Sequence, residues 1–224
     1  MTKQPQSKVS VDRQRLTYYI ALISMIGFIL MAILVRGEHV NEMDSAIIAW
    51  IQNMEHPILT QIAVGLSFIG SRDPVILLTI IVIVLSYRLL KHRMEIVLLI
   101  GVVLGSSILN LLLKLGFQRA RPDLHRLVEI TGYSFPSGHS MAAFSFYGVL
   151  AYLLWRHIPS NTGRWMLVII ATVMILSIGI SRIYLGVHYP SDILGGYLAA
   201  CTWLALLVGS YERRMGKRAV HERS

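Results

Sequence analysis

Cysteine and charged residues are both scarce in this sequence. Its 224 residues include a single cysteine, Cys201, which lies in an apolar run and has no second cysteine with which to form an internal disulfide. Charged residues make up 15% of the chain, a fraction that is less typical of a soluble globular domain, whereas 54% of the residues are hydrophobic. The hydrophobic residues fall in long uninterrupted runs, so we expect the lipid bilayer to be the solvent of this chain.

Acidic residues are few as well. The chain has 12 Asp and Glu residues against 21 Lys and Arg, which gives a formal net charge of +9. Nucleic-acid-binding proteins carry such an excess, but here the basic residues form short clusters between apolar runs and at the two ends, and this pattern argues against nucleic acid. The length suits one compact domain, so residues 1–224 are expected to form a single membrane-embedded unit.

Six charge-free runs are long enough, or nearly long enough, to cross a bilayer as helices. The first follows a basic N-terminus and lacks a small-residue cleavage pattern, so it is read as a retained anchor and not as a signal peptide. The sequence therefore predicts an all-α fold, a bundle of six transmembrane helices. The runs are Leu16–Val35, Pro74–Tyr87, Ile96–Leu113, Ser140–Trp155, Trp165–Ser181 and Ile193–Tyr211.

The distribution of basic residues predicts the orientation. With six spans, both termini and two loops lie on one side, and these segments carry 14 of the 21 Lys and Arg residues. By the positive-inside rule that side is cytoplasmic, which makes residues 1–15 and 212–224 cytoplasmic tails of a multi-pass cell-membrane protein. The two loops contain Arg88, Lys91 and Arg93, and Arg156 and Arg164.

A further uncharged segment, Pro57–Ser71, would make a seventh span if it crossed the membrane. It would then place the loop at Arg88–Arg93 outside while the N-terminal cluster stayed inside, against the positive-inside rule. We therefore expect Met43–Ser71 to form short helices at or in the outer leaflet, ending at the break Arg72–Pro74.

Three polar clusters then share the outer face, where charge close to hydrocarbon is costly and usually has a function. The first runs from Lys114 to Arg121 and Pro122 at the end of the third span. The second, Pro136–His139, precedes the fourth span, and the third, Ser181–Asp192, joins the fifth span to the sixth.

The residue types in these clusters suit phosphate chemistry. Three permanent cations require an anion between them, and the forked guanidinium groups match phosphate oxygens. Ser137 and Gly138 stand at a helix start, where backbone N–H groups and the helix dipole favour negative charge. The cations are Lys114, Arg121 and Arg182.

Two histidines complete the set. Asp192 follows His188 by four residues, so that after Pro190 a helical turn lets the carboxylate hold one ring nitrogen protonated while the other attacks phosphorus. His139 is expected to protonate the leaving group.

The same residues allow other interpretations. Ser137 as a nucleophile is disfavoured, because neither histidine need be its base. Two histidines and one aspartate would suit a metal, but three nearby cations repel a divalent ion, so no metal and no cofactor is expected. Further charged residues, within the first cluster and between it and the second, contact either a polar head group or solvent. These residues are Arg119, Asp123, His125, Arg126 and Glu129.

The three clusters resemble the signature of the type 2 phosphatidic acid phosphatase superfamily, which also includes bacterial acid phosphatases and vanadium haloperoxidases. That signature is Lys, six residues, Arg-Pro; then Pro-Ser-Gly-His; then Ser-Arg, five residues, His, three residues, Asp. Every specified position is matched, in the same order. The matching residues are Lys114, Arg121, Pro122, Pro136, Ser137, Gly138, His139, Ser181, Arg182, His188 and Asp192.

The resemblance implies a metal-independent phosphatase. It implies that His188 is the nucleophile, Asp192 its partner and His139 the acid for the leaving group. It also implies that the phosphate is held by Lys114, Arg121, Ser137, Gly138 and Arg182.

The expected substrate is a phospholipid or polyprenyl phosphate in the bilayer, such as phosphatidylglycerophosphate, phosphatidic acid or undecaprenyl diphosphate, cleaved on the extracytoplasmic side. No protein partner is implied. Two rival functions remain: a vanadate-dependent haloperoxidase, against which the six spans weigh, and a non-enzymatic anion transporter, which leaves the two histidines and the aspartate unexplained.

Overall fold

A computed structural model describes residues 5–89, 93–123 and 125–221, and these residues fold into eight helices without a strand. Lys91 of the predicted cytoplasmic loop, and residues 1–4 and 222–224 of the predicted tails, lie outside the described residues. The all-α prediction is confirmed for the part of the chain that the structure covers. The helices are α1 (Pro5–Arg36), α2 (Asn41–Gln52), α3 (Pro57–Ile69), α4 (Arg72–Leu89), α5 (Arg93–Phe117), α6 (Gly138–Trp155), α7 (Asn161–Tyr184) and α8 (Pro190–His221).

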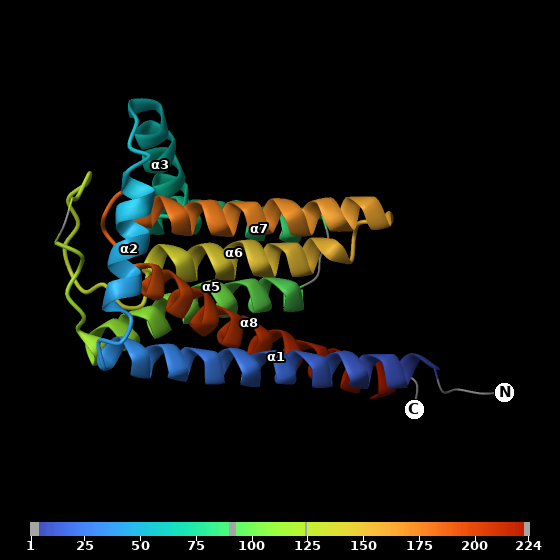
Figure 1. Cartoon of the computed structure of the whole chain (residues 1–224). Helices are drawn as coiled ribbons and strands as arrows, with labels where there is room; N and C mark the ends of the chain where they lie inside the picture. Colours follow the sequence, from blue (N-terminus) through green and yellow to red (C-terminus); the bar gives the residue numbers. More distant parts are fainter. Residues whose placement is uncertain (1–4, 90–92, 124, 222–224) are drawn as a thin grey trace.

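Each of the six predicted runs lies inside one long helix. The helices α1, α5, α6, α7 and α8 run side by side. Helix α2 and the loop residues 118–123 and 125–137 lie at the end of the bundle that is opposite to the two termini (Figure 1). Four of these helices, α1, α5, α7 and α8, are long and apolar enough to cross a membrane, and the chain is a multi-pass membrane protein.

The count of six spans stays a prediction, because α4 and α6 do not qualify by themselves. The first turn of α6 is polar, since it begins with Gly138, His139 and Ser140. Helix α4 qualifies only together with α3, from which it is bent by 53°, so that this pair is either one broken span or a re-entrant loop. The placement of the short helices α2 and α3 at the outer leaflet likewise stays a prediction.

One predicted boundary is wrong by a few residues. The break before the second span was expected at Arg72–Pro74, whereas α4 already begins at Arg72 and the chain turns at Gly70 and Ser71. Pro74 lies in the first turn of α4, where a proline costs no hydrogen bond because the first N–H groups of a helix have no partner within it.

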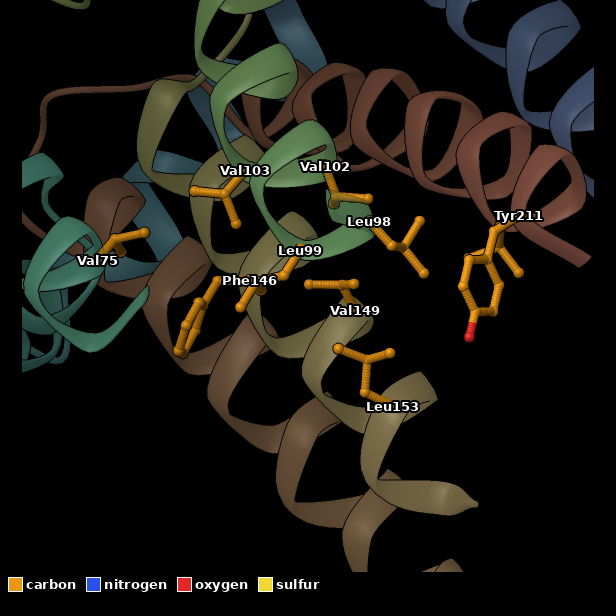
Figure 2. Close-up of a cluster of buried hydrophobic side chains, with 10 residues drawn as sticks. Val75, Leu98, Leu99, Val102, Val103, Phe146, Val149, Leu153 and Tyr211 are labelled. Atoms are coloured by element: carbon orange, nitrogen blue, oxygen red, sulfur yellow. The ribbon is translucent and has the colours of Figure 1, made fainter. Parts of the chain in front are cut away.

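The largest buried apolar cluster of the described residues lies between α4, α5, α6 and α8. Figure 2 shows apolar side chains of α5 and α6 meeting at its centre, with Val75 of α4 on one side and Tyr211 of α8 on the other. Large apolar side chains along the outside of α1, α5 and α7 are exposed, which is the pattern of helices that face lipid.

Close approach of α5 and α8 depends on a glycine. A Cβ atom at Gly105 would lie 2.3 Å from the ring of Trp203, so no larger residue fits there without a shift of that ring. The indole Nε1 of Trp203 also donates a hydrogen bond to the carbonyl oxygen of Gly101, at 3.1 Å. Gly101 and Gly105, four residues apart on α5, therefore serve packing within the chain.

Candidate active site

The site forms where three segments meet at the end of the bundle that is distant from the termini. These segments are the end of α5 with the loop residues 118–123 and 125–137, the start of α6, and the turn that joins α7 to α8 (Figure 1). His188 lies in the α7–α8 turn and is 1% exposed. The structure thus brings together side chains that are far apart in the sequence.

His188 is paired with Asp192, as the four-residue spacing predicts. Helix α8 begins at Pro190, and its first turn carries Asp192 so that Oδ2 lies 3.3 Å from Nδ1 of His188. Burial is the largest influence on the imidazole and lowers the pKa of His188 to about 4, although the neighbouring Asp192 raises it in part. The imidazole is therefore neutral at pH 7, and its Nδ1–H is the natural donor to the carboxylate.

Arg121 lies at the other nitrogen of the same ring. Its Nη1 is 3.2 Å from Nε2 of His188 and donates a hydrogen bond to the carbonyl oxygen of Val187 at 2.8 Å. Its Nε donates to the carbonyl oxygen of Gly132 at 2.9 Å, and its Nη2 to that of Thr131 at 3.3 Å. The pKa of Arg121 is lowered, chiefly by burial. The backbone on both sides thus fixes the plane of this guanidinium against the imidazole.

The other two predicted cations, Lys114 and Arg182, lie close enough to Arg121 for their charges to interact. Lys114, near the end of α5, interacts with the charges of Arg121 and Arg182, and its Nζ donates a hydrogen bond to the carbonyl oxygen of Tyr133. Arg182, in the last turn of α7, is 1% exposed and donates from Nη1 to the hydroxyl of Ser67 on α3. Its Nε and Nη2 are buried and have no hydrogen-bond partner among the described residues.

The start of α6 supplies the remaining predicted residues. Ser137 is the N-cap of α6: its Oγ accepts a hydrogen bond from the N–H of Ser140 at 3.4 Å, and its own N–H donates to the carbonyl oxygen of Asp192 at 3.0 Å. Gly138 and His139 form the first turn. A Cβ at Gly138 would lie 3.0 Å from Oδ1 of Asn110, so the backbone approaches α5 closely.

His139 belongs to the same cluster. It is half-buried, and its ring interacts electrostatically with His188, Arg182, Arg121 and Lys114. The structure therefore brings all eight predicted site residues to one end of the bundle.

Arg119 differs from what the sequence indicated. Its side chain was expected to contact a head group or solvent, but it is only 12% exposed and pairs with two buried carboxylates, those of Asp192 and Asp44. Asp123, in contrast, is a solvated loop charge, as the alternative reading held. Nothing in the sequence around Asp44 signals this pairing, because an acidic residue in the first turn of α2 is already accounted for by the helix dipole.

Ser134 is a second residue that sequence reasoning missed. Its hydroxyl donates to Oδ2 of Asp192 and lies 3.3 Å from Nδ1 of His188. Its position just ahead of the Pro136–His139 cluster was the only available signal. Ser134 and the backbone N–H of Tyr189, 2.9 Å from the same oxygen, hold the carboxylate toward the imidazole.

Comparison with known proteins identifies relatives of this chain. A model of the PAP2 superfamily matches residues 95–215. Phosphatidylglycerophosphatase B of Bacillus subtilis is 35% identical over 188 residues, which cover 83% of this chain and 92% of that protein. Lipid A 1-phosphatase of Rhizobium johnstonii is 34% identical over 124 residues, which cover 51% of this chain and 46% of that protein.

A solved structure has the same fold. The crystal structure of a transmembrane PAP2 type phosphatidylglycerolphosphate phosphatase from Bacillus subtilis superposes with a TM-score of 0.82 at 32% identity, covering 87% of this chain and 97% of that one. The predicted family and the predicted class of enzyme, a membrane phosphatase, are thereby confirmed. The chain belongs to the PAP2 superfamily.

Proposed function

We propose that this protein hydrolyses the terminal phosphate of a membrane lipid through a phosphohistidine at His188. The arrangement that carries the proposal is a neutral, buried imidazole with Asp192 at one nitrogen and the guanidinium of Arg121 at the other. A carboxylate fixes the tautomer, and a fixed cation beside Nε2 draws a phosphoryl group to the nitrogen that attacks.

In the first half-reaction, Nε2 of His188 bonds to phosphorus while the bond from phosphorus to the lipid oxygen breaks in line. His139 gives its proton to the departing alkoxide, and Asp192 stabilises the cationic ring that results. In the second half-reaction, His139 takes a proton from water, whose oxygen displaces His188 from phosphorus and releases phosphate. No metal or cofactor is part of this proposal.

The phosphate oxygens are held by Lys114, Arg121 and Arg182, with the first turn of α6 at Ser137 and Gly138. Two buried guanidinium nitrogens of Arg182, Nε and Nη2, lack a partner among the described residues and support this role, because a buried guanidinium ordinarily satisfies its donors. The first N–H groups of a helix add positive potential beside them.

A groove next to the site supports a lipid as the substrate. It has a volume of about 560 Å³, lies between α4, α5 and α6, and extends from His139 and Gly138 along apolar side chains such as Val103 and Leu104. A lipid tail would remain in an apolar surrounding while its phosphate entered the cationic site.

The substrate that we favour within this class is phosphatidylglycerophosphate, since a relative of similar length carries that activity in its name. Phosphatidic acid and undecaprenyl diphosphate are the alternatives. We further propose that the site faces the extracytoplasmic side. The termini, with their basic residues, lie at the other end of the bundle (Figure 1), and the positive-inside rule places them in the cytoplasm.

Phosphate release from these three lipids, measured with purified protein in detergent and EDTA, tests the proposal. We expect turnover in EDTA and a loss of several orders of magnitude in His188→Ala. His125→Ala is the matched control, because His125 is an exposed histidine paired with Glu55 and should tolerate the change. Full activity of His188→Ala would refute the phosphohistidine.

The same preparation distinguishes the two rivals. Bromide oxidation that depends on added vanadate would indicate a haloperoxidase. Anion flux in proteoliposomes without hydrolysis would indicate a transporter. A transporter is not expected, because transport requires no nucleophile paired with a carboxylate. A haloperoxidase is not expected, because the chain is a multi-pass membrane protein.

A further inference from the structure

Arg119 joins two buried carboxylates behind the imidazole. Its Nη1 donates a hydrogen bond to Oδ1 of Asp192 at 2.7 Å, and its Nη2 donates to Oδ2 of Asp44 at 2.9 Å. Neither carboxylate side chain is exposed to solvent. Burying three charges is costly and is a poor way to gain stability, so such a group is more readily explained by a task that requires a fixed geometry.

Ser191 closes this group into a ring of contacts. Its N–H donates to Oδ1 of Asp44 at 2.9 Å, and its hydroxyl donates to Oδ2 of Asp44. Nη1 of Arg119 also donates to the hydroxyl oxygen of Ser191, at 2.8 Å. The guanidinium carbon lies 4.0 Å from the ring centroid of Tyr189, which fixes the plane of the group.

The two oxygens of Asp192 have separate partners. Oδ2 faces His188 and accepts from Ser134 and the N–H of Tyr189, whereas Oδ1 accepts from Arg119. Rotation of the carboxylate away from the imidazole would therefore break the ion pair with Arg119.

Arg119 and Arg121 lie on opposite sides of the His188–Asp192 pair, although only Ala120 separates them in sequence. Arg121 approaches Nε2, where phosphorus is expected to bond, while the hydrogen bonds of Arg119 go to Asp192, Asp44 and Ser191. Arg119 is thus placed to act on the carboxylate and not on the phosphate.

We infer that Arg119 and Asp44 are positioning residues for the hydrolysis reaction and that they act through Asp192. This inference rests on the proposed function of Asp192. When Nε2 bonds to phosphorus the imidazole becomes a cation, and a carboxylate already fixed at Nδ1–H stabilises that charge without reorganising. Helix α2, which carries Asp44 and lies outside the segment matched by the family, is then part of the catalytic apparatus.

The test is a double-mutant cycle with Arg119→Lys and Asp192→Asn. The measured quantity is the number of lipid phosphate molecules hydrolysed per second per enzyme molecule. Lysine keeps the charge, but its single ammonium group cannot donate to Asp192 and Asp44 in the geometry of a planar guanidinium. We therefore expect kcat to fall about 10- to 100-fold while KM changes less than about threefold. In the Asp192→Asn background the same change should cause no further loss of kcat, because Arg119 then has no carboxylate through which to act.

Asp44→Asn is the second variant, and it keeps an acceptor for the N–H of Ser191. It should lower kcat about tenfold with KM nearly unchanged, and it too should have no effect in the Asp192→Asn background. If Arg119→Lys fails to fold, as judged by size exclusion and thermal unfolding in detergent, Asp44→Asn and Ser191→Ala carry the test. Arg126→Lys is the matched control, since Arg126 belongs to the same loop and donates to the carbonyl oxygen of Pro122 at 2.7 Å.

Two results would overturn this inference and leave the proposed function intact. One is wild-type kcat in Arg119→Lys or in Asp44→Asn, and the other is a loss that multiplies with that of Asp192→Asn, which would mean that Arg119 acts on the substrate directly. Wild-type kcat in Asp192→Asn would instead overturn the proposed function, so the two failures are distinguishable.

Discussion

Nη1 of Arg121 lies 3.2 Å from Nε2 of His188, and backbone carbonyl oxygens from residues 131, 132 and 187 hold the guanidinium in this position. The guanidinium of Arg121 is thus fixed beside Nε2 of His188, the nitrogen that we propose bonds to phosphorus. Positional fixing of charge contributes more to catalysis than charge alone, because no reorganisation is needed when the transition state forms.

Arg121→Lys should therefore be a severe change although it keeps the positive charge. An ammonium group cannot make the three backbone contacts and face His188 at the same time. We expect kcat/KM to fall by about two to three orders of magnitude, measured as phosphate release from a lipid phosphate. Arg126→Lys again serves as the control, and a loss below tenfold would show that charge alone suffices.

The acid limb of the pH profile should lie well below the ordinary histidine value. Burial lowers the pKa of His188 to about 4, so the ring stays neutral and nucleophilic as the pH falls through 6.5, and it loses activity only as it becomes protonated near pH 4. The measurement is kcat/KM against pH for two lipid phosphates whose own ionisations differ. If the apparent pKa of the acid limb differs between the two substrates, it reports ionisation of the substrate. An apparent pKa near 6.5 with both substrates would contradict the buried environment of His188.

His139→Ala should affect substrates unequally. General acid catalysis matters most for a leaving group that is a strong base, so loss of His139 should slow cleavage of phosphatidic acid, which releases an alkoxide, more than cleavage of undecaprenyl diphosphate, which releases a phosphate. We expect the ratio of the two kcat values to change by about tenfold or more. An equal loss on both lipids would show that His139 binds phosphate and does not donate a proton.

Arg72 should influence which lipid is preferred. It is exposed at the start of α4 and lines the same groove as His139 and Gly138. An additional cation there favours a substrate with a second phosphate, so Arg72→Gln should raise KM for phosphatidylglycerophosphate more than for phosphatidic acid, by about three- to tenfold. Equal KM changes for the two lipids would contradict a role for Arg72 in head-group selection.

Gly105→Ala should destabilise the bundle. The added methyl group would lie 2.3 Å from the ring of Trp203, and overpacking of this kind costs about 1–3 kcal/mol. The midpoint of thermal unfolding in detergent should fall, whereas Gly65→Ala in α3 should not lower it, because nothing lies within 4 Å of that position. An unchanged midpoint for Gly105→Ala would mean that α5 and α8 are further apart than described.

Local patterns were sufficient to predict several of these features. Each charge-free run forms a helix because, in a bilayer, its backbone N–H and C=O groups must find hydrogen-bond partners within the segment itself. The four-residue interval from His188 to Asp192 predicted their contact because Pro190 starts a helix and so fixes the geometry between them. The start of α4 was misplaced by a few residues, since a proline in the first turn of a helix and one in a break look alike in sequence.

The sequence by itself determined the all-α fold, the membrane runs, and the order and spacing of the site residues, because these depend on neighbours along the chain. Only the tertiary structure decided that Arg119 turns inward to Asp44 and Asp192 while Arg121 faces His188, that Ser134 supports the carboxylate, and that Ser67 meets Arg182. The partners in these contacts are separated by 58 to 115 residues. Such pairs are set by how helices pack, which leaves no periodic or local trace in the chain.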